Sequence, residues 1–366
     1  AINLNPQLVT VWVQLALLYR EQDNLELALV ACRRAKSIEP ERVDVLNAVG
    51  LVCMAREDWE QAEEALRRAA ARADTGHLRS QIEINLATIF IARKEFSTAV
   101  IFCRSALDGY PAYPKAHNIL GVALKFLNDF TSAEKSFRKA IELDKTMTEA
   151  QVNLGTVLEM SYQWDSALEC YEKALDINPK SAEAWNNRGH ILSSKKQHKA
   201  ALTDFRRAIE IDPDYAEAHL NLAFELLIHG HWIEAWPEFE WRWKTAQMKP
   251  FQRSFVAPQW DGNQRPAATL LVHAEQGLGD TLNFIRYIPM ASACVGRLIL
   301  ECQPPLLPVL REMDGIHRIL ARGDPLPSFD FHVPLLSLPG IFETTPKSIP
   351  KAVPYIYASD NSNVLL

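Results

Sequence analysis

Small residues recur along the first two thirds of the chain with a period close to 34 residues. One series consists of alanines. Most of its members have a second alanine seven residues later, and each has an alanine or glycine twelve residues earlier. Two antiparallel helices, here called helix A and helix B, approach closely only where such small residues mark the crossing. The first series is Ala28, Ala62, Ala99, Ala133, Ala167, Ala201 and Ala235.

Large apolar residues and prolines complete the pattern of helix B. A large residue fills the space between the two alanines, and a proline after the second ends the helix because it cannot continue the hydrogen-bond ladder. This pattern matches the tetratricopeptide repeat (TPR), so the resemblance implies an α-solenoid with helix A on its concave side. The large residues are Leu66, Phe137, Tyr171, Phe205 and Phe239, and the prolines are Pro40, Pro111, Pro179 and Pro213.

Two departures from the period indicate special structure. One interval is 37 residues, which predicts a longer turn near residues 73–78 between intact helices. The last repeat has Arg242 in place of the second alanine, in a helix rich in aromatic residues. An apolar terminal repeat needs cover, so these aromatics predict a seam with another domain. They are Trp232, Trp236, Phe239, Trp241 and Trp243.

The first residues also resemble the end of a helix B. Ala1, Ile2, Leu4 and Pro6 repeat the spacing of residues 208–213, so we expect further repeats upstream.

Primary amides recur two residues before the small residue of helix A. A row of amides offers donors and acceptors to the backbone of an extended peptide, whatever its sequence. It resembles the asparagine ladder of the O-linked N-acetylglucosamine transferases, and it predicts a protein or peptide partner in the concave groove. Alternatively, each amide only bonds a neighbouring turn. The positions are Gln14, Asn85, Asn153, Asn187 and Asn221, with Asn47 and Asn118 one place earlier in their repeats.

The repeat ends near residue 245, and the composition changes after a linker at 246–268. Fourteen of the 21 prolines follow Lys249. Strands expected at 269–275, 297–302 and 317–320, with further ones at 329–333 and 353–357, alternate with helices at 281–293 and 305–313. This alternation predicts a parallel, Rossmann-like α/β sheet over 269–359. Residues 360–366 are unassigned.

A glycine turn, Gln276-Gly-Leu-Gly-Asp280, follows the first of these strands. It lacks the full dinucleotide fingerprint and the Lys-Ser/Thr of a P-loop. Together with residues 301–305 and 323–327, it resembles bacterial TPR proteins that carry a heptosyltransferase-like domain. Those enzymes have the GT-B fold, of which 269–359 would be the N-terminal half.

The resemblance implies a nucleotide-sugar donor as substrate, no other cofactor, and a protein or glycan acceptor. Asp280 is then the candidate base that takes a proton from the acceptor hydroxyl. Gln276, Gly277, Gly279 and His332 are the candidate substrate-binding residues. Alternatively, Asp280 only caps its helix. Because nucleotide-sugars bind mainly to the other half of a GT-B fold, we expect this fragment to bind without transferring sugar.

Composition limits the remaining function classes. The net charge of −6 argues against nucleic acid as the main partner. No apolar run is long enough to span a membrane. The six cysteines show no paired motif and indicate buried thiols in a reducing cytoplasm. His229 and His231 lack a third ligand in sequence, so no metal site is expected. Two hypotheses remain: a TPR scaffold fused to a glycosyltransferase-like domain, and a non-catalytic TPR scaffold with a degenerate α/β domain.

Overall fold

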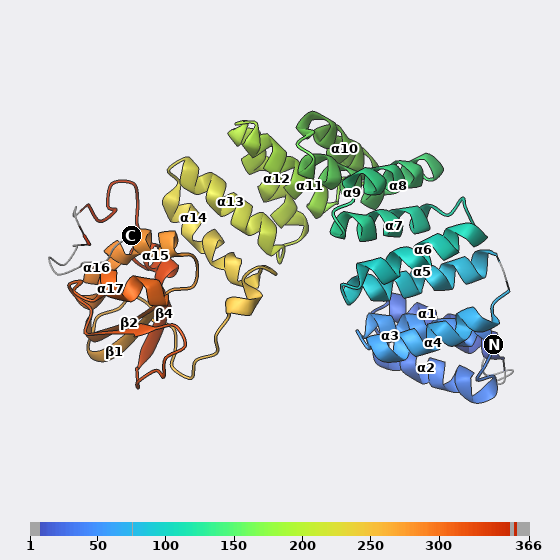
Figure 1. Cartoon of the computed structure of the whole chain (residues 1–366), viewed down its shortest axis with the longest axis horizontal. Helices are drawn as coiled ribbons and strands as arrows, with labels where there is room; N and C mark the ends of the chain where they lie inside the picture. The colour runs from blue at the N-terminus through green and yellow to red at the C-terminus, as the bar shows by residue number, and fades with distance from the viewer. Residues whose placement is uncertain (1–7, 75, 352–354, 357–366) are drawn as a thin grey trace. The chain divides into compact units, whose positions relative to one another are not determined.

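The computed structural model describes residues 8–74, 76–351 and 355–356, and it divides into two compact units, Ala1–Ile191 and Leu192–Leu366 (Figure 1). The first unit is helical, and the second combines the last helices with a small sheet. The division therefore lies before the boundary predicted at residues 245–246. The pattern of residues 1–6 and the tail 360–366 lie outside the described residues.

Helical pairs follow one another as the period predicts. Helix B ends two residues before each of Pro40, Pro111, Pro179 and Pro213, as expected. Helices A are α1 Val9–Glu21, α3 Val43–Ala55, α5 His77–Ala92, α7 Pro114–Phe126, α9 Thr148–Met160, α11 Ala182–Ser194 and α13 Ala216–Ile228. Helices B are α2 Leu25–Ile38, α4 Trp59–Arg72, α6 Phe96–Gly109, α8 Phe130–Leu143, α10 Trp164–Ile177, α12 His198–Ile211 and α14 Trp232–Phe239.

The glycines of helix A lie directly against the large residues of helix B. A Cβ atom added to Gly155 would lie 2.5 Å from Cε1 of Tyr171, and one on Gly121 would lie 2.6 Å from Cε1 of Phe137. Both aromatic side chains are fully buried. The predicted close crossing is confirmed at these pairs, because no side chain fits between the two helices there.

The 37-residue interval has a different cause from the one predicted. Four residues separate α4 from α5, as between α2 and α3, so the turn is not longer. Instead α5 has 16 residues, whereas α3 and α7 have 13. The three extra residues add almost one turn to the start of helix A. Ser80, directly after these three residues, donates a hydrogen bond to the carbonyl oxygen of Ala106 (2.7 Å), which ties the start of α5 to α6.

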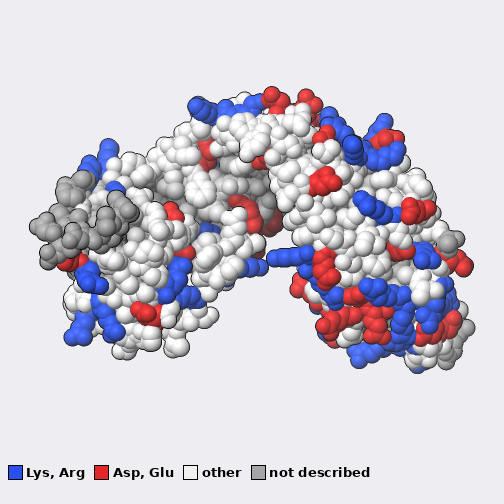
Figure 2. Space-filling view, in the orientation of Figure 1, with Lys and Arg blue, Asp and Glu red and all other residues white. Residues whose placement is uncertain are grey.

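Charged side chains of both signs cover the outer helices of the first repeats (Figure 2). Glu41 pairs with Arg68 and Arg72, and Glu63 pairs with Arg67 at 2.7 Å. Such exposed pairs contribute little to stability. Because these paired residues carry both signs, they do not form a uniformly basic stripe.

In the second unit, α12 to α14 precede a four-stranded parallel sheet in the order β3-β2-β1-β4. The central strands are β2 and β1, and β3 and β4 are the edge strands. The predicted parallel sheet is confirmed, except that the strand expected at 353–357 lies largely outside the described residues. The strands are β1 Arg265–His273, β2 Val295–Cys302, β3 Arg318–Ala321 and β4 Phe331–Pro334.

The connections between strands are shorter and more broken than predicted. The helix expected at 281–293 is α15 Leu278–Phe284, the 3₁₀ turn η3 Ile285–Tyr287 and α16 Ile288–Ser292. Pro289 lacks an N–H group and interrupts the ladder. The others are η4 Pro304–Leu306, α17 Leu307–Leu310, η5 Leu335–Ser337 and α18 Leu338–Ile341, with η1 Glu240–Lys244 and η2 Lys249–Phe251 before the sheet.

The sheet is covered differently on its two faces. Leu270, Val272 and Leu300 pack in one apolar cluster with the short helices and with Trp236 and Phe239 of α14. On the other face, Leu271, Ile299 and Leu320 lie under Phe255 and Phe329. Phe255 belongs to the segment 246–268 predicted as a linker, and Trp260 of the same segment is fully buried. That segment therefore packs as part of the sheet domain.

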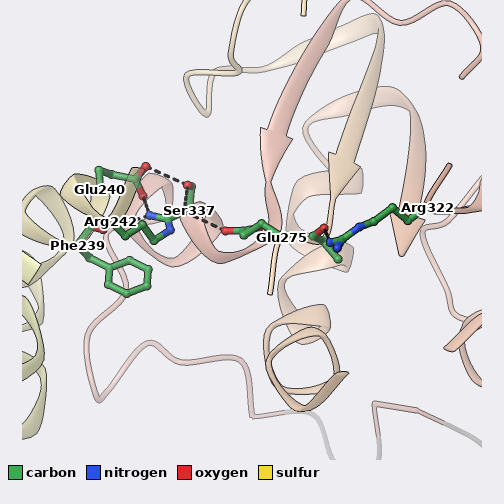
Figure 3. A network of polar contacts seen from close by, with 7 residues as sticks. Phe239, Glu240, Arg242, Glu275, Arg322 and Ser337 are labelled. Carbon is green, nitrogen blue, oxygen red and sulfur yellow. Dashed lines mark hydrogen bonds and ion pairs between the residues drawn. The ribbon is translucent and has the colours of Figure 1, made fainter. Parts of the chain in front are cut away.

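A buried ion pair joins the last repeat to the sheet (Figure 3). Arg242 in η1 is 1% exposed, and its Nη2 lies 3.0 Å from Oε1 of Glu275, just after β1. The same nitrogen donates to Oγ of Ser337 (2.8 Å), and Nη1 donates to Oε1 of Glu240 (2.7 Å). Burial raises the pKa of Glu275, and Arg242 opposes that rise.

The aromatic residues of α14 contribute unequally to this seam. The indole N–H of Trp236 donates to the carbonyl oxygen of Thr344 (2.8 Å), and Phe239 is buried under the Arg242 guanidinium. Trp241 instead stacks on His219 of α13, with ring centroids 3.8 Å apart. The predicted seam is thus confirmed at Trp236 and Phe239, whereas Trp241 packs within the last repeat.

Replacement of Gly155 by alanine should lower the free energy of unfolding by about 1–3 kcal/mol, because Tyr171 has no room to move. Urea unfolding followed by far-UV circular dichroism measures the change. Gly279→Ala is the control, since its Cβ would meet nothing within 4 Å. That variant should gain up to about 1 kcal/mol from helix propensity. A Gly155→Ala protein as stable as the wild type would contradict the close crossing.

Arg242→Met should lower the free energy of unfolding of the second unit by about 3–5 kcal/mol, because the Glu275 carboxylate loses its buried partner. Urea unfolding followed by tryptophan fluorescence reports on the seam. Adding Glu275→Leu to this variant should recover most of the loss. Lys244→Met is the matched control: Lys244 forms an exposed pair with Asp214 at 3.2 Å, so its loss should cost under about 1 kcal/mol. Equal losses for the two single variants would refute this role of Arg242.

Candidate functional site

The asparagines of neighbouring helices A form hydrogen-bonded pairs. Nδ2 of Asn85 on α5 donates to Oδ1 of Asn47 on α3 (3.3 Å). In the same way, Nδ2 of Asn153 on α9 donates to Oδ1 of Asn118 on α7 (3.2 Å). Each pair joins an asparagine at the offset position to one at the regular position. The sequence did not predict this pairing.

Within each pair one amide is buried and the other is partly open. Asn118 is 4% exposed and Asn85 is 9% exposed, whereas Asn47 and Asn153 are half-buried. The buried member therefore serves mainly to hold its neighbour. The half-buried member keeps donors and acceptor capacity that a ligand can use.

The other predicted amides differ in their surroundings. Gln14 on α1 is exposed. Asn187 on α11 is half-buried, and its Oδ1 accepts a hydrogen bond from Nδ2 of Asn186 (3.2 Å). Asn221 on α13 is half-buried and belongs to the second unit. The structure thus groups Asn47, Asn85, Asn118 and Asn153 into two pairs of the first unit, and it gives Gln14 and Asn221 other settings.

Two charged residues of opposite sign lie on helices A of the first unit and influence each other's pKa. Burial lowers the pKa of Lys125 on α7, and Glu183 on α11 partly restores it. Burial raises the pKa of Glu183, which is nevertheless exposed to solvent. The two residues lie on helices A two repeats apart, and each opposes the effect of burial on the pKa of the other.

The turn after β1 places the candidate catalytic residue at a helix start. Oδ2 of Asp280 accepts a hydrogen bond from the backbone N–H of Gly277 (3.1 Å). Asp280 is the third residue of α15, and by this bond to the N-cap residue it caps the helix, as the alternative interpretation of the sequence expects. Because α15 has only seven residues, its dipole is small.

Two residues that sequence reasoning missed hold this turn. Nε2 of Gln303, just after β2, donates to the carbonyl oxygen of Gln276 (2.5 Å). Oγ1 of Thr281 donates to Oε1 of Gln303 (3.0 Å). The position of Gln303 directly after a strand next to β1 was the available signal, because parallel strands end at the same edge.

The two glycines of the turn have no conformational need to be glycine. Neither Gly277 nor Gly279 is in the left-handed region, and a Cβ on Gly279 would meet nothing within 4 Å. Glycine inside a helix costs about 1 kcal/mol relative to alanine. The fold therefore supplies no reason for Gly279, and close approach of another molecule to the backbone would supply one.

His332 lies on a different part of the sheet from the turn. It pairs in register with Leu271, two residues before the end of β1. Its ring lies 4.5 Å from the ring of Phe255 and 5.6 Å from that of His273, between centroids. Burial lowers the pKa of His273 to about 3 and also lowers the pKa of His332. Both rings are therefore neutral near pH 7.

This face of the sheet also buries charged groups. Glu301 of β2 is 1% exposed and pairs with Arg253, and Arg322 donates to the carbonyl oxygen of Ala274. His273 Nε2 and His332 Nδ1 are buried without a hydrogen-bond partner among the described residues. The face under Phe255 is thus polar at the edge where β1 and β2 end.

A third group of polar residues arises from the fold alone. His198 at the start of α12 and Glu225 on α13 both lie close to His229. The sequence places no third ligand near His229 and His231, but the structure brings two together with His229. All six cysteines, by contrast, are free and buried, as predicted.

The comparisons with known proteins agree with the repeats. Family models described as tetratricopeptide repeat match residues 9–42, 50–117, 114–147, 182–215 and 205–236, and one described as TPR repeat matches 163–195. BBSome complex member BBS4 from Xenopus tropicalis is 25% identical over 121 residues, and that from Mus musculus is 25% identical over 122. Each match covers 33% of this chain and 23% of the relative, so the chain spans about a quarter of their length.

Two solved structures share the solenoid fold. The APC/C hetero-tetramer Cut9-Hcn1 has a TM-score of 0.56 at 18% identity, over 62% of this chain and 44% of that one. Pseudomonas aeruginosa pilF has a TM-score of 0.50 at 18% identity, over 57% of this chain and 94% of that one. At this identity the likeness concerns the fold. Across the described residues, no helix has the length and apolar character needed to cross a membrane. The chain is a tetratricopeptide-repeat protein, whose solenoid is a scaffold for protein–protein interaction.

Proposed function

We propose that the helix A face of the first unit binds an extended protein segment through the half-buried amides of its asparagine pairs. The observation that supports this proposal is the hydrogen bonding of Asn153 to Asn118 and of Asn85 to Asn47. A paired amide already has a fixed orientation, so its side chain loses less conformational entropy when a ligand binds. The free donors and acceptors then meet the ligand backbone, which all peptides share.

Two charged residues on helices A add selectivity to this backbone contact. Lys125 on α7 and Glu183 on α11 have opposite signs, and each favours an opposite charge on the ligand. We therefore expect ligands with charged residues of both signs. The buried free thiols suit a reducing compartment, so we place this interaction in the cytoplasm.

The double substitution Asn47→Ala with Asn153→Ala should weaken peptide binding by about 5- to 100-fold, since each lost hydrogen bond contributes about 0.5–1.5 kcal/mol. The probe is a peptide enriched from a random phage-displayed library on the wild-type chain, and fluorescence anisotropy measures its affinity.

Asn178→Ala is the matched control for this experiment. Asn178 follows α10 and accepts a hydrogen bond from the backbone N–H of Lys180 (3.0 Å), away from helix A. Its substitution should leave affinity unchanged. Peptide affinity that survives the double substitution would show that the asparagine pairs are only structural.

A second candidate function rests on Gly279 and its turn. We propose that the α/β part belongs to a glycosyltransferase-like domain, with a nucleotide-sugar donor and a protein or glycan acceptor. The glycine without an internal role supports a ligand close to the backbone at residues 276–280. In this proposal Oδ1 of Asp280 accepts the proton of an acceptor hydroxyl, while Oδ2 remains bonded to the N–H of Gly277.

Asp280→Asn should reduce sugar transfer by about 10²- to 10⁴-fold in the natural protein that carries this chain, since the amide is no base. Stability should change little, because asparagine still accepts the Gly277 hydrogen bond. Transfer is measured as nucleoside diphosphate released from UDP-, GDP- and ADP-sugars. Asp129→Asn, at the cap of α8, is the control with no chemistry near it. Absence of turnover in the wild type would favour a non-catalytic α/β domain.

A further inference from the structure

Three metal-ligating side chains meet where α12 begins and α13 ends. His198 is the first residue of α12, Glu225 lies on α13, and His229 directly follows α13. Glu225 and His229 are four residues apart, so they lie on one face of the helix. One ligand atom from each of the three residues lies within 4.8 Å of the others.

Both imidazoles lie close to the same carboxylate oxygen. Nε2 of His229 lies 3.3 Å from Oε1 of Glu225, and Nδ1 of His198 lies 2.6 Å from the same oxygen. Zinc bonds of about 2.0–2.2 Å at tetrahedral angles separate two ligand atoms by about 3.3 Å. The atoms of Glu225 and His229 therefore already have this separation. The atoms of Glu225 and His198 are at hydrogen-bond distance, and they must move apart by about 0.7 Å to bind the same zinc ion.

The carboxylate at the centre is held in place by its surroundings. Glu225 is 2% exposed, and its Oε2 accepts a hydrogen bond from Oγ of Ser193 (2.5 Å). Such a second contact orients a metal-binding carboxylate. The two imidazole rings lie edge to face with centroids 4.3 Å apart, which keeps both nitrogens close to Oε1.

The cluster opens into a cavity of about 600 Å³. His198 and His229 line this cavity together with His231, Lys196 and Lys199. A fourth ligand can therefore enter from solvent. The two lysines disfavour a cation in general, but both are exposed and so their charges are screened. They favour an anion, such as hydroxide, at the open position.

We propose that His198, Glu225 and His229 form a binding site for Zn²⁺, with three protein ligands and a fourth position open to the cavity. Two imidazoles and one carboxylate are a ligand set that zinc accepts. The site is independent of the helix A asparagines and of the turn at Gly277, so it goes beyond the proposed function. Tests of either function can fail without affecting it.

Equilibrium dialysis of the untagged chain against Zn²⁺ should find one zinc ion per chain, after prior treatment with a chelator. His198→Ala and His229→Ala should each weaken binding by at least about tenfold. Both side chains are about one-third exposed (31% and 32%), so these variants should fold. Glu225→Gln should also weaken binding, and circular dichroism checks that it folds.

His190→Ala is the matched control. His190 Nδ1 forms the same 2.6 Å contact, here with Oε1 of Glu159. Among the described residues, however, only Glu225 has a second histidine close enough to complete a set of three ligands. The loss of His190 should therefore leave zinc affinity unchanged.

Co²⁺ in place of zinc should give the strong visible absorption of a four-coordinate site. Zinc binding that survives the double substitution His198→Ala with His229→Ala would overturn the proposal, as would a wild-type chain that binds no zinc.

Discussion

The close approach of paired helices at a glycine or alanine is the constraint on which the solenoid depends. At Gly50, Gly121 and Gly155 the helix B side chain occupies the space that a Cβ atom would need. Three positions in each repeat are thereby fixed by packing. The asparagines of helix A lie at other positions, partly or fully buried between neighbouring helices A, where no such close crossing is required. Packing thus leaves the helix A face free to vary in chemistry while the repeat stays the same.

The last repeat has a charged residue at the position of the second alanine of helix B. Arg242 stands where other repeats have the second alanine, and its side chain leaves the helical pair to reach Glu275 and Ser337. A buried ion pair adds little net stability over an apolar contact, but it is costly to break and it tolerates one arrangement only. We therefore regard Arg242 as the residue that fixes how the final helix meets the sheet, while Trp236 and Phe239 supply the apolar contact.

Periodic features could be predicted from sequence, and features made by contact across the fold could not. Small residues, prolines and alternating strands repeat, so they indicated the solenoid and the parallel sheet. The spacing alone could not show that three extra residues lengthen α5, because a longer turn would give the same interval. The turn between helix A and helix B could not be recognised by residue type either. In the first six repeats one residue of this turn has a left-handed backbone conformation, and its type differs from repeat to repeat: Asp23, Glu57, Lys94, Asn128, Tyr162 and Lys196. The meeting of His198 with Glu225 was equally hidden, since 27 residues separate them.

The asparagine pairs show why a structural and a functional role need not exclude each other. Sequence reasoning treated a bond to a neighbour and a bond to a ligand as alternatives. In the structure, Asn118 is buried and accepts a hydrogen bond from Asn153, which is half-buried. One N–H of the Asn153 amide is used in this bond, and the other N–H and the oxygen are then fixed in direction. The bond to the neighbouring repeat is therefore what orients the remaining groups, and a ladder of such pairs presents polar groups at a spacing set by the repeats.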